Sequence, residues 1–227
     1  MKKTEKSEIK WRGIRSTELK INENEPVTTL NRYKQKTISL PRISDDKRWA
    51  GYPGITGVSR KIARIIEDKV KKPQKYYVEP FAGTAKVYQA LNKSKGLFYK
   101  YILNDKSDFV YKWLKGELAC DFTVITNEDF GLCMLKYDTE ETVFVIDHPW
   151  NKSYYNQSFS CFDRNNVKEY NEQVLEICRK LKGKFIITTR RENKLMYQSE
   201  FNHKEITSEY PVSGRYPKIL LTSNIDI

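Results

Sequence analysis

Short apolar segments alternate with amphipathic segments of helical periodicity along most of this 227-residue chain, and this alternation restricts its fold more than any other feature. Between the apolar segments, hydrophobic residues recur three and four positions apart, which indicates helices. Strands that alternate with helices predict a mostly parallel sheet covered on both faces. Five strands are predicted in this part of the chain, at residues 76–78, 99–103, 122–125, 143–146 and 184–189.

The last part of the chain departs from this alternation. Two further strands are predicted at residues 204–207 and 219–222. The segment between them contains turn-forming residues such as Pro211 and Gly214 instead of a helical pattern. Two consecutive strands without a helix between them predict an antiparallel hairpin at one edge of the sheet. The expected fold class is α/β, with a mostly parallel seven-stranded sheet and an antiparallel C-terminal hairpin.

Two single residues predict helix boundaries. Ser59 precedes a stripe of apolar residues at helical spacing, so it is predicted to be the N-cap of a helix. Gly183 follows a second such stripe, within residues 167–181, and is predicted to be the C-terminal cap of that helix.

The charge balance of the chain favours a polyanionic partner. Lys and Arg number 41 against 29 Asp and Glu, which gives a formal net charge of +12 and a pI of about 9.4. DNA and RNA are such partners, whereas a lysine-rich surface without a ligand is the alternative. Half of this excess lies in residues 1–48, which contain 13 basic and seven acidic residues. These residues are predicted to form a basic N-terminal arm before a folded domain at residues 49–227.

Cysteine and histidine usage argues against a metal site. The four cysteines form no CxxC pair and the chain has only two histidines, so no zinc site is predicted and the thiols are expected to be free. The sequence starts without the apolar core of a signal peptide and contains no run of about 20 apolar residues. A cytoplasmic protein without a membrane span is therefore expected.

The residues directly after the first three strands predict a ligand site. In open parallel sheets, ligands bind beyond the carboxyl ends of the strands, where the strand order reverses. The first strand leads into residues 79–85 (EPFAGTA), whose small residues allow a sharp turn and the close approach of a ligand. The second strand leads into Asp105, a carboxylate suited either to ribose hydroxyls or to an Asx turn, and the third leads into Asp129 and Phe130.

The fourth strand leads into the tetrad Asp147-His148-Pro149-Trp150. The Asp147 carboxylate and a nearby main-chain carbonyl are acceptors for the two hydrogens of an amino group, while Trp150 offers a face on which a flat base can stack. This arrangement suits the exocyclic amine of a nucleobase taken out of its stack, and the alternative is a turn with Trp150 in the core. The first and fourth strands can share one site only where the strand order reverses, so they are predicted to be neighbours.

Three segments, in this order, resemble the Dam-like class of S-adenosylmethionine-dependent DNA N6-adenine methyltransferases. Residues 48–51 (RWAG) resemble the segment that precedes the cofactor loop of that class, residues 79–85 resemble the loop, and residues 147–150 are similar to its Asp-Pro-Pro-Tyr tetrad. The resemblance covers roughly residues 47–225 and includes the last strand. It implies a Rossmann-like methyltransferase fold, with S-adenosyl-L-methionine as the cofactor.

The resemblance also implies roles for particular residues. In the tetrad, Asp147 and the main-chain carbonyl of His148 accept the hydrogens of the target amine, Pro149 belongs to the turn, and Trp150 stacks on a flipped adenine. No metal is implied. Cofactor contacts are implied for the segment before the loop, for the loop itself and for the acids after the second and third strands, namely Trp49, Ala50, Gly51, Glu79, Phe81, Gly83, Asp105, Asp129 and Phe130.

The chain departs from that class at three places. His148 stands where the class has proline, the usual Gly-Gly-Lys segment is interrupted at residues 55–61, and no room remains between Asp105 and Asp147 for a target-recognition domain. The expected activity is methylation of the 6-amino group of adenine in DNA. RNA is the alternative substrate. A second alternative is that the chain is not an enzyme but an inactive subunit with a methyltransferase fold, which binds nucleic acid or a partner. Recognition of a target sequence in the nucleic acid is then expected to depend on the basic arm, on loops, or on a specificity subunit or a second copy of the chain.

Overall fold

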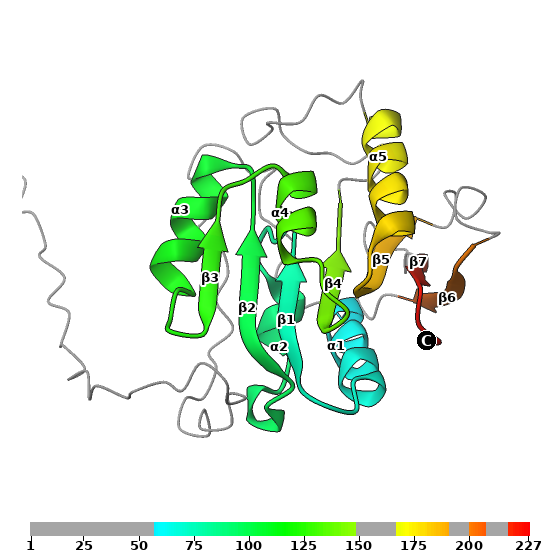
Figure 1. The fold of residues 1–227 in the computed structure, drawn as a ribbon, viewed down its shortest axis with the longest axis horizontal. Helices are drawn as coiled ribbons and strands as arrows, with labels where there is room; N and C mark the ends of the chain where they lie inside the picture. Colours follow the sequence, from blue (N-terminus) through cyan, green and yellow to red (C-terminus); the bar gives the residue numbers. More distant parts are fainter. Residues whose placement is uncertain (1–56, 149–166, 191–199, 208–217) are drawn as a thin grey trace, which may run out of the picture.

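The computed structural model describes residues 57–148, 167–190, 200–207 and 218–227. These residues form one seven-stranded sheet with helices packed against it (Figure 1). The strands are β1 (Gln74–Glu79), β2 (Phe98–Asn104), β3 (Thr123–Thr126), β4 (Thr142–Ile146), β5 (Lys184–Arg190), β6 (Asn202–Thr207) and β7 (Lys218–Ser223). The helices are α1 (Gly57–Lys69), α2 (Lys86–Ala90), α3 (Asp108–Glu117), α4 (Phe130–Tyr137) and α5 (Val167–Lys180), with a 3-10 turn at Lys93–Lys95.

The strand order confirms the predicted topology. Across the sheet the order is β3-β2-β1-β4-β5-β7-β6, and β1 pairs in parallel with both β2 and β4. The first and fourth strands are therefore neighbours at the point where the order reverses. β7 runs antiparallel between β5 and β6, which gives the expected C-terminal hairpin. Because β1 to β4 are parallel, their carboxyl ends share one edge of the sheet, at the arrowheads in Figure 1.

Alternate residues of each central strand pack against opposite layers of helices. In β4, Val143 and Val145 join the core cluster that contains residues of α1, α2 and α3, whereas Phe144 and Ile146 join the cluster that contains residues of α4 and α5. All four side chains are buried, and burial of each contributes about 1.5–3 kcal/mol to stability. This alternation determines which side of the sheet receives each residue that follows β4.

The sequence pattern indicates only a loop at residues 127–130, yet helix α4 begins at Phe130. Asp129 is its N-cap, because the Asp129 side chain accepts a hydrogen bond from Gly131 N at 3.0 Å. The helix has only eight residues, and Leu132 and Leu135 are exposed on it. An exposed pair of leucines weakens the amphipathic pattern, which explains why periodicity does not reveal this helix.

Both predicted helix boundaries are wrong. α1 begins at Gly57, so Ser59 lies within the helix and is buried there. Gly183 lies beyond the end of α5 and lacks the positive φ of a capping glycine. Close packing explains this glycine instead, since a Cβ here would lie 2.9 Å from the Phe144 side chain and 3.0 Å from the Thr142 carbonyl oxygen.

None of the described helices has both the length and the hydrophobicity that crossing a bilayer requires. Within the described ranges, no group of three or more His, Cys, Asp and Glu side chains is placed to hold a metal ion. Cys120, Cys133 and Cys178 are free thiols, and the latter two are buried.

Candidate functional site

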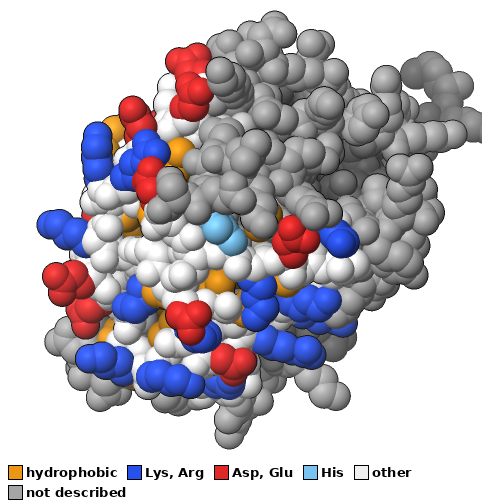
Figure 2. Space-filling model, turned by 90° about the vertical axis from the view of Figure 1, so that its right-hand side faces the viewer, with side chains coloured by type: hydrophobic (Ala, Val, Ile, Leu, Met, Phe, Trp, Pro, Cys, Tyr) orange, Lys and Arg blue, Asp and Glu red, His pale blue; other side chains and the backbone are white. Residues whose placement is uncertain are grey.

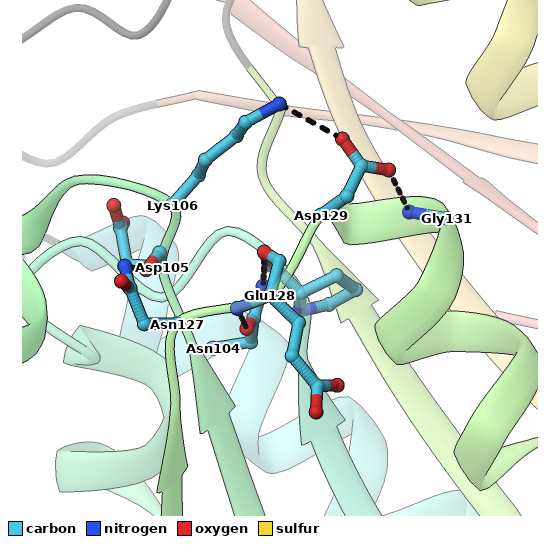
Figure 3. Close-up of polar contacts among 8 residues, drawn as sticks. Asn104, Asp105, Lys106, Asn127, Glu128, Asp129 and Gly131 are labelled. Carbon is cyan, nitrogen blue, oxygen red and sulfur yellow. Dashed lines mark hydrogen bonds and ion pairs between the residues drawn. The ribbon is translucent and has the colours of Figure 1, made fainter.

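Asn104, at the end of β2, joins the ends of three strands through its side chain (Figure 3). Its Nδ2 donates to the carbonyl oxygens of Pro80 at 2.9 Å and Glu128 at 3.0 Å. Its Oδ1 accepts from the Thr126 hydroxyl and from Glu128 N, both at 2.8 Å. The side chain is fully buried and uses both donor hydrogens and both acceptor directions of its amide. Asn104 therefore holds the ends of β1, β2 and β3 together.

The loop after β1 turns through two residues in the left-handed region. Gly83 has φ +49° and Ala85 has φ +50°, and this conformation costs a residue with a Cβ about 1–2 kcal/mol. The loop is held against the end of β2, since Ala82 N donates to the Asn104 carbonyl oxygen at 2.7 Å and Gly83 N donates to Asp105 Oδ2 at 2.9 Å. Apart from Gly83 and its two chain neighbours, no described residue has an atom within 4 Å of a Cβ built on Gly83, so a ligand can approach the loop backbone there.

Asp105 lies between this loop and the start of α3. Its Oδ2 accepts from Gly83 N, and its Oδ1 accepts from Ser107 N at 2.9 Å. The second contact is an Asx turn, as the alternative interpretation predicts, although the N-cap of α3 is Ser107. Burial raises the pKa of Asp105, while the two backbone donors act in the opposite direction. Each carboxylate oxygen retains a second acceptor direction, so these bonds leave a ribose contact chemically feasible.

Aromatic rings connect the ends of β1 and β4 with α4. Phe81, in the loop after β1, stacks on Phe130 with ring centroids 4.9 Å apart. The Phe81 ring also lies 6.3 Å from the imidazole of His148, at the end of β4. The structure thus brings together three residues that the sequence places far apart. Asp129, next to this cluster, pairs with Lys106 at 3.1 Å (Figure 3).

Asp147 is exposed at the end of β4, and a threonine of the neighbouring strand contacts it. Ile146 and Ile187 are partners in the register of β4 and β5, so the next residues, Asp147 and Thr188, lie opposite each other. The Thr188 hydroxyl donates to Asp147 Oδ1. By the alternation of the strand, both residues follow Val145 towards the helix layer of α1 and α2. Thr188 can therefore fix the rotation of the Asp147 carboxylate.

The imidazole of His148 is fully buried, although the resemblance implies a role only for its main-chain carbonyl. It follows Ile146 to the side of α4 and α5, where its Nε2 forms a hydrogen bond with Oδ1 of Asn171 on α5. Nδ1 has no hydrogen-bond partner among the described residues. Burial lowers the pKa of His148 to about 4, so the ring is neutral at physiological pH.

Glu79, the last residue of β1, lies in a buried polar cluster on the α2 side of the sheet. It accepts from the Tyr77 hydroxyl at 2.5 Å and from Tyr88 N at 2.7 Å. Burial raises the pKa of Glu79 to about 7. Lys93 lies 3.9 Å from the Tyr88 ring, and burial lowers the pKa of Lys93 to about 7. The observed partners of Glu79 are thus structural, and the cofactor contact predicted for it stays a prediction.

Several predicted site residues lie outside the described residues, namely Trp49, Ala50, Gly51, Pro149 and Trp150, as does the predicted arm at residues 1–48. Conversely, the sequence pattern predicted no role for Asn104, Thr188 or Asn171. Asn104 directly precedes the predicted acid, so an Asn-Asp pair after a strand was a usable signal. Thr188 and Asn171 carried no local signal, because only strand register and helix packing place them beside the tetrad.

Residues 56–121 match the family model described as D12 class N6 adenine-specific DNA methyltransferase. The matched segment contains the loop after β1 and Asp105, and it ends before Asp147. No match was found among curated proteins.

Solved structures share the fold at low sequence identity. The structure of PH0851 superposes with a TM-score of 0.51 and 12% identity over 74% of this chain, which spans only 45% of that protein. The putative RNA methyltransferase PH1948 from Pyrococcus horikoshii gives a TM-score of 0.51 and 7% identity over 73% of this chain and 81% of that one. The putative methyltransferase yhhF from Escherichia coli gives a TM-score of 0.49 and 12% identity over 82% of this chain and 92% of that one.

The chain has a Rossmann-like methyltransferase fold. The match of residues 56–121 to a methyltransferase family agrees with this fold.

Proposed function

We propose that this methyltransferase-fold chain transfers a methyl group from S-adenosylmethionine to the 6-amino group of adenine in DNA. The observation that carries the proposal is the adjacency of two strand ends. β1 and β4 are parallel neighbours, and Phe81 of the loop after β1 lies 6.3 Å from His148 of the tetrad. A cofactor on the loop would therefore lie beside a base held by Asp147. The family match supports adenine in DNA as the target.

The residues after β1, β2 and β3 fit the cofactor. The loop backbone is approachable at Gly83, Asp105 presents a carboxylate beside it, and Phe81 with Phe130 forms an apolar stack. In this proposal Asp105 accepts from ribose hydroxyls, and Asp129 with Phe130 lies along the adenine of the cofactor. When bound, S-adenosylmethionine supplies an electrophilic methyl group on a sulfonium.

The chain contributes orientation rather than covalent chemistry. In this proposal the Asp147 carboxylate and the His148 carbonyl oxygen accept the two amine hydrogens, which aims the nitrogen lone pair at the methyl group. Thr188 holds the Asp147 carboxylate in place by donating to Oδ1. Burial of the His148 ring lowers its pKa to about 4, so the imidazole is a poor base for a proton of the amine. Trp150 is proposed to stack on the flipped base.

The distribution of charge favours the arm as the source of phosphate contacts. Figure 2 shows the face beside the β6–β7 edge, where Lys and Arg side chains mix with Asp and Glu. Residues 1–48 instead carry half of the net positive charge of the chain. We therefore assign the salt-dependent part of DNA binding to this basic arm, with sequence choice supplied by loops, a specificity subunit or a second copy.

The test is methyl transfer by the purified chain to one sequence prepared both as DNA and as RNA. Digestion and mass spectrometry should detect N6-methyladenine in the DNA. Methylation of the RNA alone would instead establish the alternative substrate. Calorimetry of S-adenosylmethionine, run in parallel, separates these outcomes from the inactive subunit, which would bind without transferring to either polymer.

A further inference from the structure

A buried asparagine of α5 contacts the second residue of the tetrad. Asn171 and His148 are each 0% exposed, and His148 Nε2 forms a hydrogen bond with Asn171 Oδ1 across 23 positions of sequence. The sequence offers no reason for a polar residue there, since the same face of α5 carries Val174, Leu175 and Cys178 in the core. Those side chains fix the helix against β4 and β5, so Asn171 is held by a rigid element.

The hydrogen bond specifies one form of the imidazole. Asn171 Oδ1 can only accept, so this contact favours the neutral ring with its proton on Nε2 and with Nδ1 unprotonated. The centroids of the Phe81 ring and the imidazole lie 6.3 Å apart. With its side chain held between α5 and the loop after β1, His148 has little freedom to move its main chain at the end of β4.

This restraint compensates for the missing proline. A proline has a fixed φ, whereas a histidine at the end of a strand does not. The His148 carbonyl is one of the two proposed acceptors for the target amine, and a small misplacement of such a group can slow transfer considerably.

We propose that Asn171 is a positioning residue of the methyl-transfer site, which holds the His148 main chain in place by accepting the Nε2 hydrogen of its side chain. This role rests on the proposed function. It predicts that Asn171 acts through His148 on the rate of transfer rather than on the binding of cofactor.

The first measurement does not require activity. The chain has only two histidines, so the ring signals of His148 can be assigned by nitrogen-detected NMR with one substitution. The wild type should show the neutral Nε2–H form. In Asn171→Leu, a near-isosteric variant without the acceptor, the Nε2–H signal should shift, whereas Gln173→Ala, an exposed change on the same helix, should leave it unchanged. A wild-type ring protonated on Nδ1 would overturn the proposal.

The second measurement separates positioning from stability. Asn171→Leu should lower kcat at least tenfold while the affinity for S-adenosylmethionine changes less than twofold, and Asn171→Asp, which keeps an acceptor, should retain most of the activity. In a His148→Pro background, Asn171→Leu should change kcat less than threefold. An active wild type whose Asn171→Leu variant keeps its kcat would overturn the positioning role alone. A wild type that methylates neither DNA nor RNA would overturn the proposed function together with it.

Discussion

The two halves of the candidate site are held in different ways. At the ends of β1, β2 and β3, one buried side chain, Asn104, makes four hydrogen bonds, three of them to main-chain atoms. At the end of β4, Asp147 and His148 are held by side chains from separate elements, Thr188 of β5 and Asn171 of α5. The proposed cofactor half is thus built from contiguous strand ends, whereas the proposed substrate half depends on tertiary packing.

This difference has a consequence for mutation. Damage to the Asn104 network should destabilise the whole fold, because main-chain groups would lose their partners in a buried position. Damage at the end of β4 should leave the fold intact and impair transfer. The following substitutions test that contrast, from the largest expected effect to the smallest.

Asn104→Ala should have the largest effect on stability. It leaves the buried carbonyl of Pro80 and both main-chain groups of Glu128 without these partners, which predicts a loss of about 3 kcal/mol or more in the free energy of unfolding. Denaturant titration checks this value. Asn127→Ala removes only one exposed bond to the Asp105 carbonyl, so it should cost less than about 1 kcal/mol. Equal losses in the two variants would refute the central position of Asn104.

The two halves should also respond to pH with opposite signs. The folded-state pKa of Glu79 is raised from 4.5 to about 7, so its contribution to stability is present below pH 4.5 and is lost as pH rises to 7. The folded-state pKa of His148 is lowered from 6.5 to about 4, so its contribution is present above pH 6.5 and is lost as pH falls to 4. Each change is worth up to about 3 kcal/mol.

Unfolding free energies of the wild type, Glu79→Gln and His148→Asn, measured from pH 4 to 8, isolate these contributions. Relative to the wild type, Glu79→Gln should become more stable as pH rises, and His148→Asn should become more stable as pH falls. Parallel pH profiles for all three proteins would show that neither group is buried as described.

Thr188→Val should have a moderate effect, mostly on catalysis. The change preserves shape and removes the hydroxyl that donates to Asp147 Oδ1, so kcat should fall about tenfold while stability changes by about 1 kcal/mol. Steady-state kinetics and denaturant titration measure the two quantities. Thr207→Val makes the same chemical change at an exposed position of β6 and should alter neither. A Thr188→Val enzyme with normal kcat would show that Asp147 needs no restraint from β5.

Lys106→Met should have the smallest effect. The ion pair between Lys106 and Asp129 is largely exposed, with 49% and 40% of the two side chains accessible, so its loss should cost less than about 0.5 kcal/mol. Asp129→Ala should cost about 1 kcal/mol, because it removes the N-cap of α4 as well. Thermal unfolding compares the stabilities of the two variants. A larger loss of stability in Lys106→Met than in Asp129→Ala would show that the ion pair, and not the N-cap, stabilises this region.

Much of the fold follows from local sequence, and less of the site does. The adjacency of β1 and β4 was predictable, because both are short apolar strands and the residues after them are candidates for one shared site. Helix α4 was not predictable from the sequence, because its exposed Leu132 and Leu135 obscure its helical periodicity. Gly183 gave a misleading signal, because close packing and helix capping both select glycine.

The role of the His148 ring depended on a contact that no spacing rule predicts. Strand alternation past Ile146 does indicate that His148 turns to the opposite side from Asp147. Identifying Asn171 as its partner requires the packing of α5 on β4, which arises from nonlocal contacts.

The central claim is that the Asp147 carboxylate holds the target amine for methyl transfer. Single-turnover transfer to a DNA oligonucleotide, with calorimetry of S-adenosylmethionine on the same samples, tests this claim most directly for Asp147→Asn. The account predicts a loss of transfer of at least a hundredfold with cofactor affinity changed less than threefold, and normal transfer by Asp121→Asn, an exposed acid before β3. An Asp147→Asn chain that methylates adenine at the wild-type rate would contradict the account.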